Sequence, residues 1–316
     1  MKKVSKNVLI NLCILSVLIL GACGTQSNED KATKIESGKK IGILFVNHGS
    51  RADTWRQALL DLETTVKDSI LKNQNIKGTK TAFMEYTEPS IATRLKEFDK
   101  EGYTDIVIVP VFLTVSTHSF DDIPTISGQK QDAHSMETLK TEKIECYKPK
   151  ANVHIAPLLD FTDVLQKNIL RRVQEISKNA TDEGLVLIAY GDHTYNKEWT
   201  ELLTKVGTYV TQNTGMTDFS YGWCGHVAQY NPDSTTVAIN RVLKKKKIAT
   251  VIPVLVAIDD MFQVKIIGDG INKIPGSKEK VLYNADAILP DKNVENWVIR
   301  ISNEYANKLV SEIAKN

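Results

Sequence analysis

The chain has 316 residues, and its formal net charge is +2. Its composition, 42% hydrophobic and 25% charged, is that of a globular protein with enough apolar residues for a core. The near-neutral charge provides no basic footprint for nucleic acid, so no nucleic-acid partner is expected, and the run Lys244–Lys247 is interpreted as the solvated end of a helix.

The first residues predict an export signal. Lys2, Lys3 and Lys6 precede the apolar run Val8–Leu20, which is short for a membrane span. The small residues before Cys23 resemble the lipobox of bacterial lipoproteins, in which the cysteine thiol is diacylglycerol-modified. We therefore expect a signal peptide over 1–23, lipidation at Cys23, and an extracytoplasmic protein that meets the bacterial membrane through its lipid anchor only. The alternative is a plain secretory signal with a chance cysteine.

The next segment, 24–40, is rich in Ser, Thr, Asn, Glu and Lys and predicts a flexible tether. Beyond it the chain contains two cysteines, Cys146 and Cys224. An oxidising location would permit a disulfide between them, and the sequence leaves open whether they pair. There is no CxxC pair and no thiolate zinc signature.

Strand-like and helix-like segments then alternate. In the first half the apolar patterns predict strands at 41–46, 79–84, 106–113 and 152–156, with helices at 52–71, 91–98 and 161–177. The polar stretch 127–145, which contains His134, is interpreted as a loop over a cleft or a surface excursion. His154 lies within a predicted strand and is interpreted as a packed or hydrogen-bonded residue.

The second half repeats this alternation. Strands are predicted at 185–189, 220–223 and 249–256, and helices at 198–212, 234–243 and 293–314. Strands that alternate with helices favour parallel sheets covered on both faces.

Three landmarks align the two halves. The segment 46–50 corresponds to 189–192, the segment 88–90 to 231–233, and the segment 110–113 to 253–256. This indicates a duplicated α/β unit, with an N-terminal lobe over 41–150 and a C-terminal lobe over 151–316. Ligands of such folds bind beyond the carboxyl ends of the strands, so a cleft between the lobes is expected there. The oligomeric state is left open.

Two histidines are expected at that edge of the first sheet. His48 follows the strand 41–46 and precedes a turn in which the amides of Ser50 and Arg51 open a helix and favour anions. His118 follows the strand 106–113 after the short turn 114–117. A lone histidine at a strand end is more often structural or merely exposed than functional. Two imidazoles that converge on one cleft predict a site for a divalent transition metal.

Two acids follow the strand that is predicted between these histidines in the chain. Glu85 comes directly after the strand 79–84, and Glu88 follows three residues later. A carboxylate beside two histidines can bind a metal ion or accept a proton, so both acids are catalytic candidates.

Three ordered segments resemble the CbiX-type sirohydrochlorin chelatases. The segment 47–51, NHGSR, resembles their (G)HGSR opening. The segment 83–91, FMEYTEPSI, resembles their F-x-E-x-x-E-P-S/T-I stretch, and 110–124 resembles their P-x-F-L…H…D-I-P stretch through PVFL, His118 and DDIP. Asn47 and Ser116 stand where the family usually has glycine, and neither change removes a ligand. The second half is similar only in its skeleton.

The resemblance implies a chelatase-like fold of two Rossmann-like lobes that inserts a divalent ion, Co²⁺, Fe²⁺ or Ni²⁺, into sirohydrochlorin or a related tetrapyrrole. The ion is a substrate, and no organic cofactor is implied. By position, His48, His118 and Glu85 match catalytic residues that bind the metal, and Glu88 is the second candidate for the acid. Ser50 and Arg51 would bind the peripheral carboxylates of the ring. The alternative for Arg51 is a surface ion pair.

The C-terminal lobe lacks an equivalent histidine pair. Tyr190 occupies the place of His48, and Met261 occupies that of His118. Other polar residues near its strand ends could face the cleft or be structural or solvated. These are Asp192, His193, His226, Asp259 and Asp260.

Three functions compete. The first is a chelatase. The second is a non-catalytic extracytoplasmic lipoprotein that binds haem, another tetrapyrrole or a metal ion, which the export signal favours because the chelatase substrates are expected in the cytosol. The third is a transporter-associated binding protein with an unrelated ligand, which would not need His48 and His118 to converge. Fold alone does not decide among them.

Overall fold

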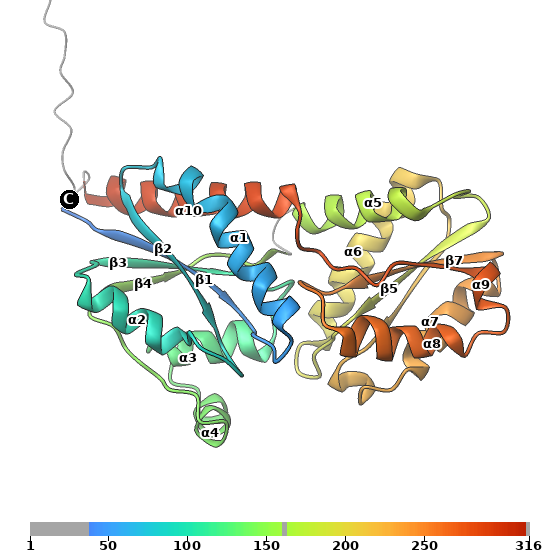
Figure 1. Ribbon diagram of the computed structural model, residues 1–316, viewed down its shortest axis with the longest axis horizontal. Coiled ribbons are helices and arrows are strands. Elements are labelled where there is room, and N and C mark those ends of the chain that lie inside the picture. The colour runs from blue at the N-terminus through green and yellow to red at the C-terminus, as the bar shows by residue number, and fades with distance from the viewer. Residues whose placement is uncertain (1–37, 160–162, 314–316) are drawn as a thin grey trace, which may run out of the picture. The chain divides into compact units, whose positions relative to one another are not determined.

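The computed structural model describes residues 38–159 and 163–313, which belong to one compact unit (Figure 1). The predicted signal peptide, the lipidation site at Cys23 and nearly all of the predicted tether lie outside the described residues. Within the described part of the chain, no helix has the length and apolar character needed to cross a membrane.

Two parallel four-stranded sheets form the framework. The first has the order β2-β1-β3-β4, and the second has the order β6-β5-β7-β8. Because the order of the strands is the same in both sheets, the predicted α/β fold with two similar lobes is confirmed. The strands are β1 (Ile41–Asn47), β2 (Ile76–Phe83), β3 (Asp105–Pro110), β4 (Asn152–Ile155), β5 (Glu183–Ala189), β6 (Phe219–Trp223), β7 (Ile248–Val254) and β8 (Val281–Tyr283).

The chain is divided between the lobes differently from the prediction. The strand β4 pairs with β3, with Asn152 opposite Asp105, so the chain leaves the first sheet after Ile155 and not at residue 150. The last helix, α10 (Lys292–Ile313), returns to the first lobe and contacts β3 and α1 (Asp53–Leu71). The C-terminal segment therefore contributes to both lobes.

Strand β1 is buried on both faces, as expected for a central strand of a parallel sheet. Ile43 and Phe45 pack into a core that runs through both lobes and includes α1, α10, α5 (Val164–Ile176) and α6 (Asn196–Thr214). Leu44 and Val46 face the opposite side, under α2 (Ile91–Lys100) and α3 (Ile123–Ile126). Figure 1 shows α10 beside α1 and extending towards α5.

The second sheet is covered in the same way. Its outer face packs against α7 (Asp233–Leu243), the π-helix η4 (Met261–Ile267) and α8 (Gly268–Asn272). The remaining short elements were not predicted. They are the π-helix η1 (Thr117–Asp122), the 3₁₀-helix η3 (His226–Ala228) and α9 (Ser277–Lys280).

The stretch 127–145, interpreted from its polarity as a loop, contains α4 (Ala133–Thr141). The Asp132 side chain accepts a hydrogen bond from the Ser135 amide at 2.8 Å and caps this helix, and Leu139 anchors it in the core. His134 is exposed on α4. An N-cap and one buried apolar side chain are therefore enough to hold a helix that has little apolar periodicity.

The two cysteines left open by the sequence are both free, Cys146 at the surface and Cys224 buried. His154 has the structural partner expected of it, because its Nε2 lies 3.1 Å from the Asp105 carboxylate.

Candidate metal centre

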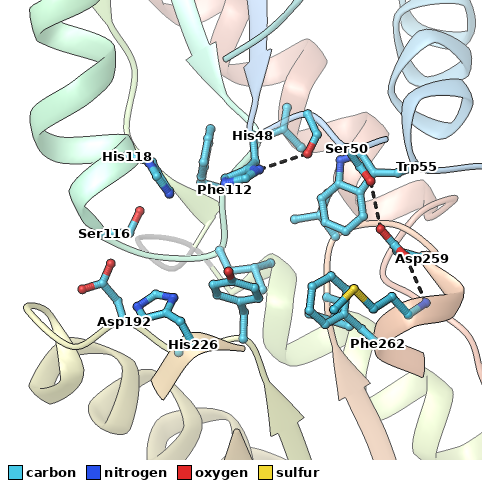
Figure 2. A pocket seen from close by; sticks show the side chains of 18 of the residues that line it. His48, Ser50, Trp55, Phe112, Ser116, His118, Asp192, His226, Asp259 and Phe262 are labelled. Atoms are coloured by element: carbon cyan, nitrogen blue, oxygen red, sulfur yellow. Dashed lines mark hydrogen bonds between the residues drawn. The ribbon is translucent and has the colours of Figure 1, made fainter. Parts of the chain in front are cut away.

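A cavity of about 360 Å³ lies between the lobes, at the carboxyl ends of the central strands (Figure 2). Residues that follow β1 and β3 line it from the N-terminal lobe, and residues that follow β5, β6 and β7 line it from the C-terminal lobe. This is the edge at which parallel α/β sheets bind ligands. His48 and His118 both face it.

The turn after β1 places His48. The Asn47 side chain accepts a hydrogen bond from the Gly49 amide at 3.0 Å and donates one to the Ala82 carbonyl at 3.3 Å. Gly49 has a φ of +90°, and a Cβ at this position would collide with the Glu85 carbonyl oxygen. Asn47, which stands where the family usually has glycine, therefore stabilises the turn through its side-chain hydrogen bonds.

Hydrogen bonds beyond the ends of the strands place Glu85 beside His48. The Met84 amide donates to the Asn47 carbonyl, and the Glu85 amide donates to the His48 carbonyl, both at 2.9 Å. These bonds continue the pairing of β1 with β2 past Phe83. The Glu85 side chain is only 7% exposed, so its carboxylate is buried beside the two histidines.

The π-helix η1 carries His118. Ser116 caps it: its hydroxyl accepts a hydrogen bond from the Ser119 amide at 3.2 Å, and the Ser119 hydroxyl accepts one from the Ser116 amide at 2.9 Å. The serine that replaces the family's glycine therefore provides a reciprocal cap. One turn later, Asp122 Oδ2 lies 2.8 Å from His118 Nδ1.

His48, Glu85 and His118 form a group whose candidate ligand atoms all lie within 4.8 Å of one another, and among the described residues it is the only such group of three. Nε2 of His48 is 3.9 Å from one Glu85 oxygen, and Nδ1 of His118 is 3.8 Å from the other. These separations exceed a hydrogen bond. Two ligand atoms that each lie about 2.0–2.2 Å from a shared ion are separated by a distance comparable to that between His48 Nε2 and Glu85, so this pair fits a divalent ion, and His118 adds a third candidate ligand.

The hydrogen bonds of the imidazoles indicate which nitrogens are free. Nδ1 of His48 donates to the Gly49 carbonyl at 3.0 Å, and Nδ1 of His118 donates to Asp122. With both Nδ1 atoms protonated, each Nε2 keeps its lone pair for an ion.

The two histidines differ in their pKa. Burial, reinforced by the nearby His118, lowers the pKa of His48, which favours the neutral ligand form. Burial also opposes a charge on His118, but the Asp122 hydrogen bond and the Glu85 charge outweigh it and raise the pKa of His118. An arriving ion therefore competes with a proton on His118.

Asp122 is the residue of this centre that the sequence did not identify. It is buried, and it orients His118 as the outer-shell carboxylate of a metal-bound histidine does. The signal in the sequence was its spacing, four residues after His118.

We expect Asp122→Asn to lower the affinity for Co²⁺ by about 10- to 100-fold, because the imidazole loses its charged partner. Titration calorimetry of the variant measures this. The exposed Asp260, which does not line the cavity, provides the control Asp260→Asn. Unchanged affinity in Asp122→Asn would remove Asp122 from the centre.

Glu88 does not join the histidines. Its carboxylate is exposed and accepts a hydrogen bond from the Ser90 amide at 2.6 Å, just before α2. Although partial burial opposes the charge, this bond lowers the pKa of Glu88. The turn after Tyr86, whose φ is +65°, directs the two acids to different places.

The isosteric pair Glu85→Gln and Glu88→Gln therefore separates the two candidate acids. We expect Glu85→Gln to bind Co²⁺ at least about 10-fold more weakly because it loses a charged ligand. Glu88→Gln should bind like the unaltered chain. Equilibrium dialysis measures both, and the reverse order of affinities would contradict the assignment.

Ser50 and Arg51 differ from the prediction of an anion site at a helix start. The helix α1 begins at Asp53, so the amides of Ser50 and Arg51 precede it and an acid occupies its first turn. The Ser50 hydroxyl donates to Asp259 of the other lobe at 2.8 Å. Arg51 is exposed, lies 5.0 Å from the centre of the Tyr86 ring and lines the cavity, where it remains the candidate for substrate carboxylates.

Five residues named from the sequence line the cavity from the C-terminal lobe, and two do not. Those that line it are Tyr190, Asp192, His226, Asp259 and Met261. His193 and Asp260 are exposed outside it. The three candidate ligands that the structure brings together all belong to the N-terminal lobe.

The CbiX family model matches residues 42–176, which include the whole centre. The sirohydrochlorin cobaltochelatase of Methanosarcina barkeri is 33% identical over 138 residues, which are 43% of this chain and 97% of that protein. The one of Methanococcoides burtonii is 39% identical over 88 residues, 28% of this chain and 64% of that protein, so this match spans less than two thirds of the relative.

Solved structures share the fold. The sirohydrochlorin chelatase SirB from Bacillus subtilis subspecies spizizenii, in complex with cobalt, superposes with a TM-score of 0.60 at 18% identity, over 85% of this chain and 96% of that one. SirB from Bacillus subtilis with Fe³⁺ superposes with a TM-score of 0.61 at 17% identity, over 84% of this chain and 96% of that one.

Proposed function

This chain belongs to the CbiX family, and from that membership we propose that it inserts a divalent metal ion into sirohydrochlorin or a related tetrapyrrole. The observation that carries the proposal is the group His48, Glu85 and His118, whose two histidines line a cavity between the lobes. A macrocycle in that cavity would present its nitrogens to an ion held by the group.

The chemistry follows from these residues. Neutral imidazoles and a carboxylate replace part of the water around the ion and hold it in place. As the pyrrole nitrogens lose their protons, they become stronger ligands and take the ion over. Arg51, above the Tyr86 ring at the edge of the cavity, is placed to pair with a ring carboxylate.

Co²⁺ is the ion that we propose first. Relatives matched by the chain are named cobaltochelatases, and a site of two imidazoles and one carboxylate suits Co²⁺, Fe²⁺ and Ni²⁺. The test incubates the purified chain with sirohydrochlorin and Co²⁺ and follows the absorbance of the macrocycle. A rate no higher than that of the uncatalysed reaction would contradict the proposal.

A second candidate function is non-catalytic capture of haem or another tetrapyrrole outside the cell. The feature that favours it is the predicted export signal that ends in Cys23. A parallel incubation of the purified chain with haem separates the two functions, because tight retention of haem without acceleration of metal insertion supports capture.

We also propose that Cys23 carries a lipid anchor that holds the protein to the outer side of the bacterial membrane. The supporting features are the lysines, the apolar run and the small residues that precede this cysteine. We expect Cys23→Ser to release the protein from the membrane fraction, and Cys13→Ser, within the apolar run, to leave it there. Cell fractionation and intact mass measure this, and an unlipidated Cys23 would contradict it.

A further inference from the structure

The cavity wall opposite the metal centre belongs to the C-terminal lobe. Metal insertion, the proposed function, releases two pyrrole protons from the ring. A base on the face of the ring away from the ion takes such a proton without bringing a second positive charge close to the ion. The titratable residues of this wall are Tyr190, Asp192, His226, Tyr230 and Asp259.

The two carboxylates of this wall already accept hydrogen bonds from other residues. Asp192 accepts hydrogen bonds from the amides of Thr194 and Tyr195, at 2.8 and 3.0 Å, and from the Thr117 amide of the other lobe at 3.3 Å. Asp259 accepts from the Ser50 hydroxyl and from the Met261 amide at 3.0 Å. These hydrogen bonds engage both oxygens of each carboxylate.

The two tyrosines of this wall are also unsuited to accept a proton. Burial, together with the hydrogen bond to Tyr230, raises the pKa of Tyr190 well above its ordinary value, so this phenol stays protonated. Its hydroxyl lies 3.1 Å from that of Tyr230, which leaves the two phenols paired with each other.

His226 remains. It begins η3, which Cys224 and Gly225 separate from β6, and its ring packs against Tyr190 and His193 with centroid distances of 5.3 and 5.2 Å. Within the described part of the chain its imidazole nitrogens make no hydrogen bond. Figure 2 shows His226 beside Asp192, across the cavity from His118.

The electrostatic surroundings of His226 suit a base. Partial burial lowers its pKa, and the neighbouring His193 and His118 act in the same direction, so the imidazole is neutral before reaction. The Asp192 charge acts the opposite way and stabilises the imidazolium once it forms.

We propose that His226 is a catalytic base that accepts pyrrole protons on the face of the ring opposite His48, Glu85 and His118. The pyrrole N–H bond breaks, its electron pair stays on the nitrogen and binds the incoming ion, and the proton forms a new bond with an imidazole nitrogen. His226 is partly exposed and passes the proton to water before it accepts the second one. This assignment rests on the proposed function.

The test uses the full-length chain with sirohydrochlorin and Co²⁺. His226→Gln should lower kcat by about 100-fold or more, the usual contribution of a general base. Binding of Co²⁺ alone and of metal-free sirohydrochlorin should stay within about twofold, since the ligands and the cavity are intact. The matched control is His134→Gln, which alters an exposed imidazole on α4 outside the cavity and should keep the unaltered kcat.

A second measurement distinguishes a catalytic role of His226 from a structural one. Added imidazoles should restore kcat in His226→Ala, and the restored rate should rise with the basicity of the imidazole used. A kcat for His226→Gln close to that of an active unaltered chain would overturn the proposal, as would parallel loss of Co²⁺ or ring binding, or absence of rescue. An unaltered chain that is itself inactive would instead refute the proposed function, and the base with it.

Discussion

Replacing His118 by alanine should lower both the affinity for Co²⁺ and the rate of chelation by at least about 100-fold. The change removes one of the three ligands and leaves the buried Asp122 carboxylate without its imidazole partner. His48→Ala should act similarly, because it removes the ligand on the opposite side of Glu85. Calorimetry with Co²⁺ and the absorbance of sirohydrochlorin measure the two effects.

The matched control is His134→Ala, which removes an exposed imidazole on α4 outside the cavity. Its affinity and rate should equal those of the unaltered chain. If His48→Ala and His118→Ala chelate cobalt as fast as the control, these histidines are not the metal centre.

Gly49→Ala should destabilise the fold by about 2–5 kcal/mol and abolish metal binding. A residue with a side chain is strained at a φ of +90° by about 1–2 kcal/mol, and the added Cβ would also push on the Glu85 carbonyl, an overpacking cost of about 1–3 kcal/mol. Because that carbonyl belongs to the ligand itself, the shift reaches the metal centre. Denaturant unfolding and Co²⁺ titration measure the two losses.

Gly102→Ala separates the two costs. Gly102 also has a positive φ, +74°, but a Cβ there meets nothing within 4 Å. This variant should lose only the strain energy, about 1–2 kcal/mol, and should bind Co²⁺ normally. Equal effects of the two substitutions would show that contact with Glu85 is not what makes glycine necessary at position 49.

The strands were predictable because burial on both faces leaves nearly continuous apolar runs, as in β1 and β3. The lobe boundary was not predictable in the same way. Whether β4 joins the first sheet or the second depends on which strand it pairs with, and its four residues carry no information about the partner. The return of α10 to the first lobe is likewise a tertiary contact.

Some residues of the candidate metal centre could likewise be predicted from the sequence, and others could not. His48 and His118 were predictable because each follows a strand at the same edge of the sheet. The choice between Glu85 and Glu88 depended on hydrogen bonds past the end of β2 and on the positive φ of Tyr86. Asp122 was missed because its contact with His118 requires the π-helical turn η1, where the sequence predicted only a turn after the strand.

The most direct test is anomalous diffraction at the cobalt absorption edge from crystals of the chain soaked in Co²⁺. We expect one strong peak within bonding distance, about 2.0–2.2 Å, of His48, His118 and Glu85. A peak beside His193 and His226 instead, with none at these three residues, would contradict the assignment of the metal centre.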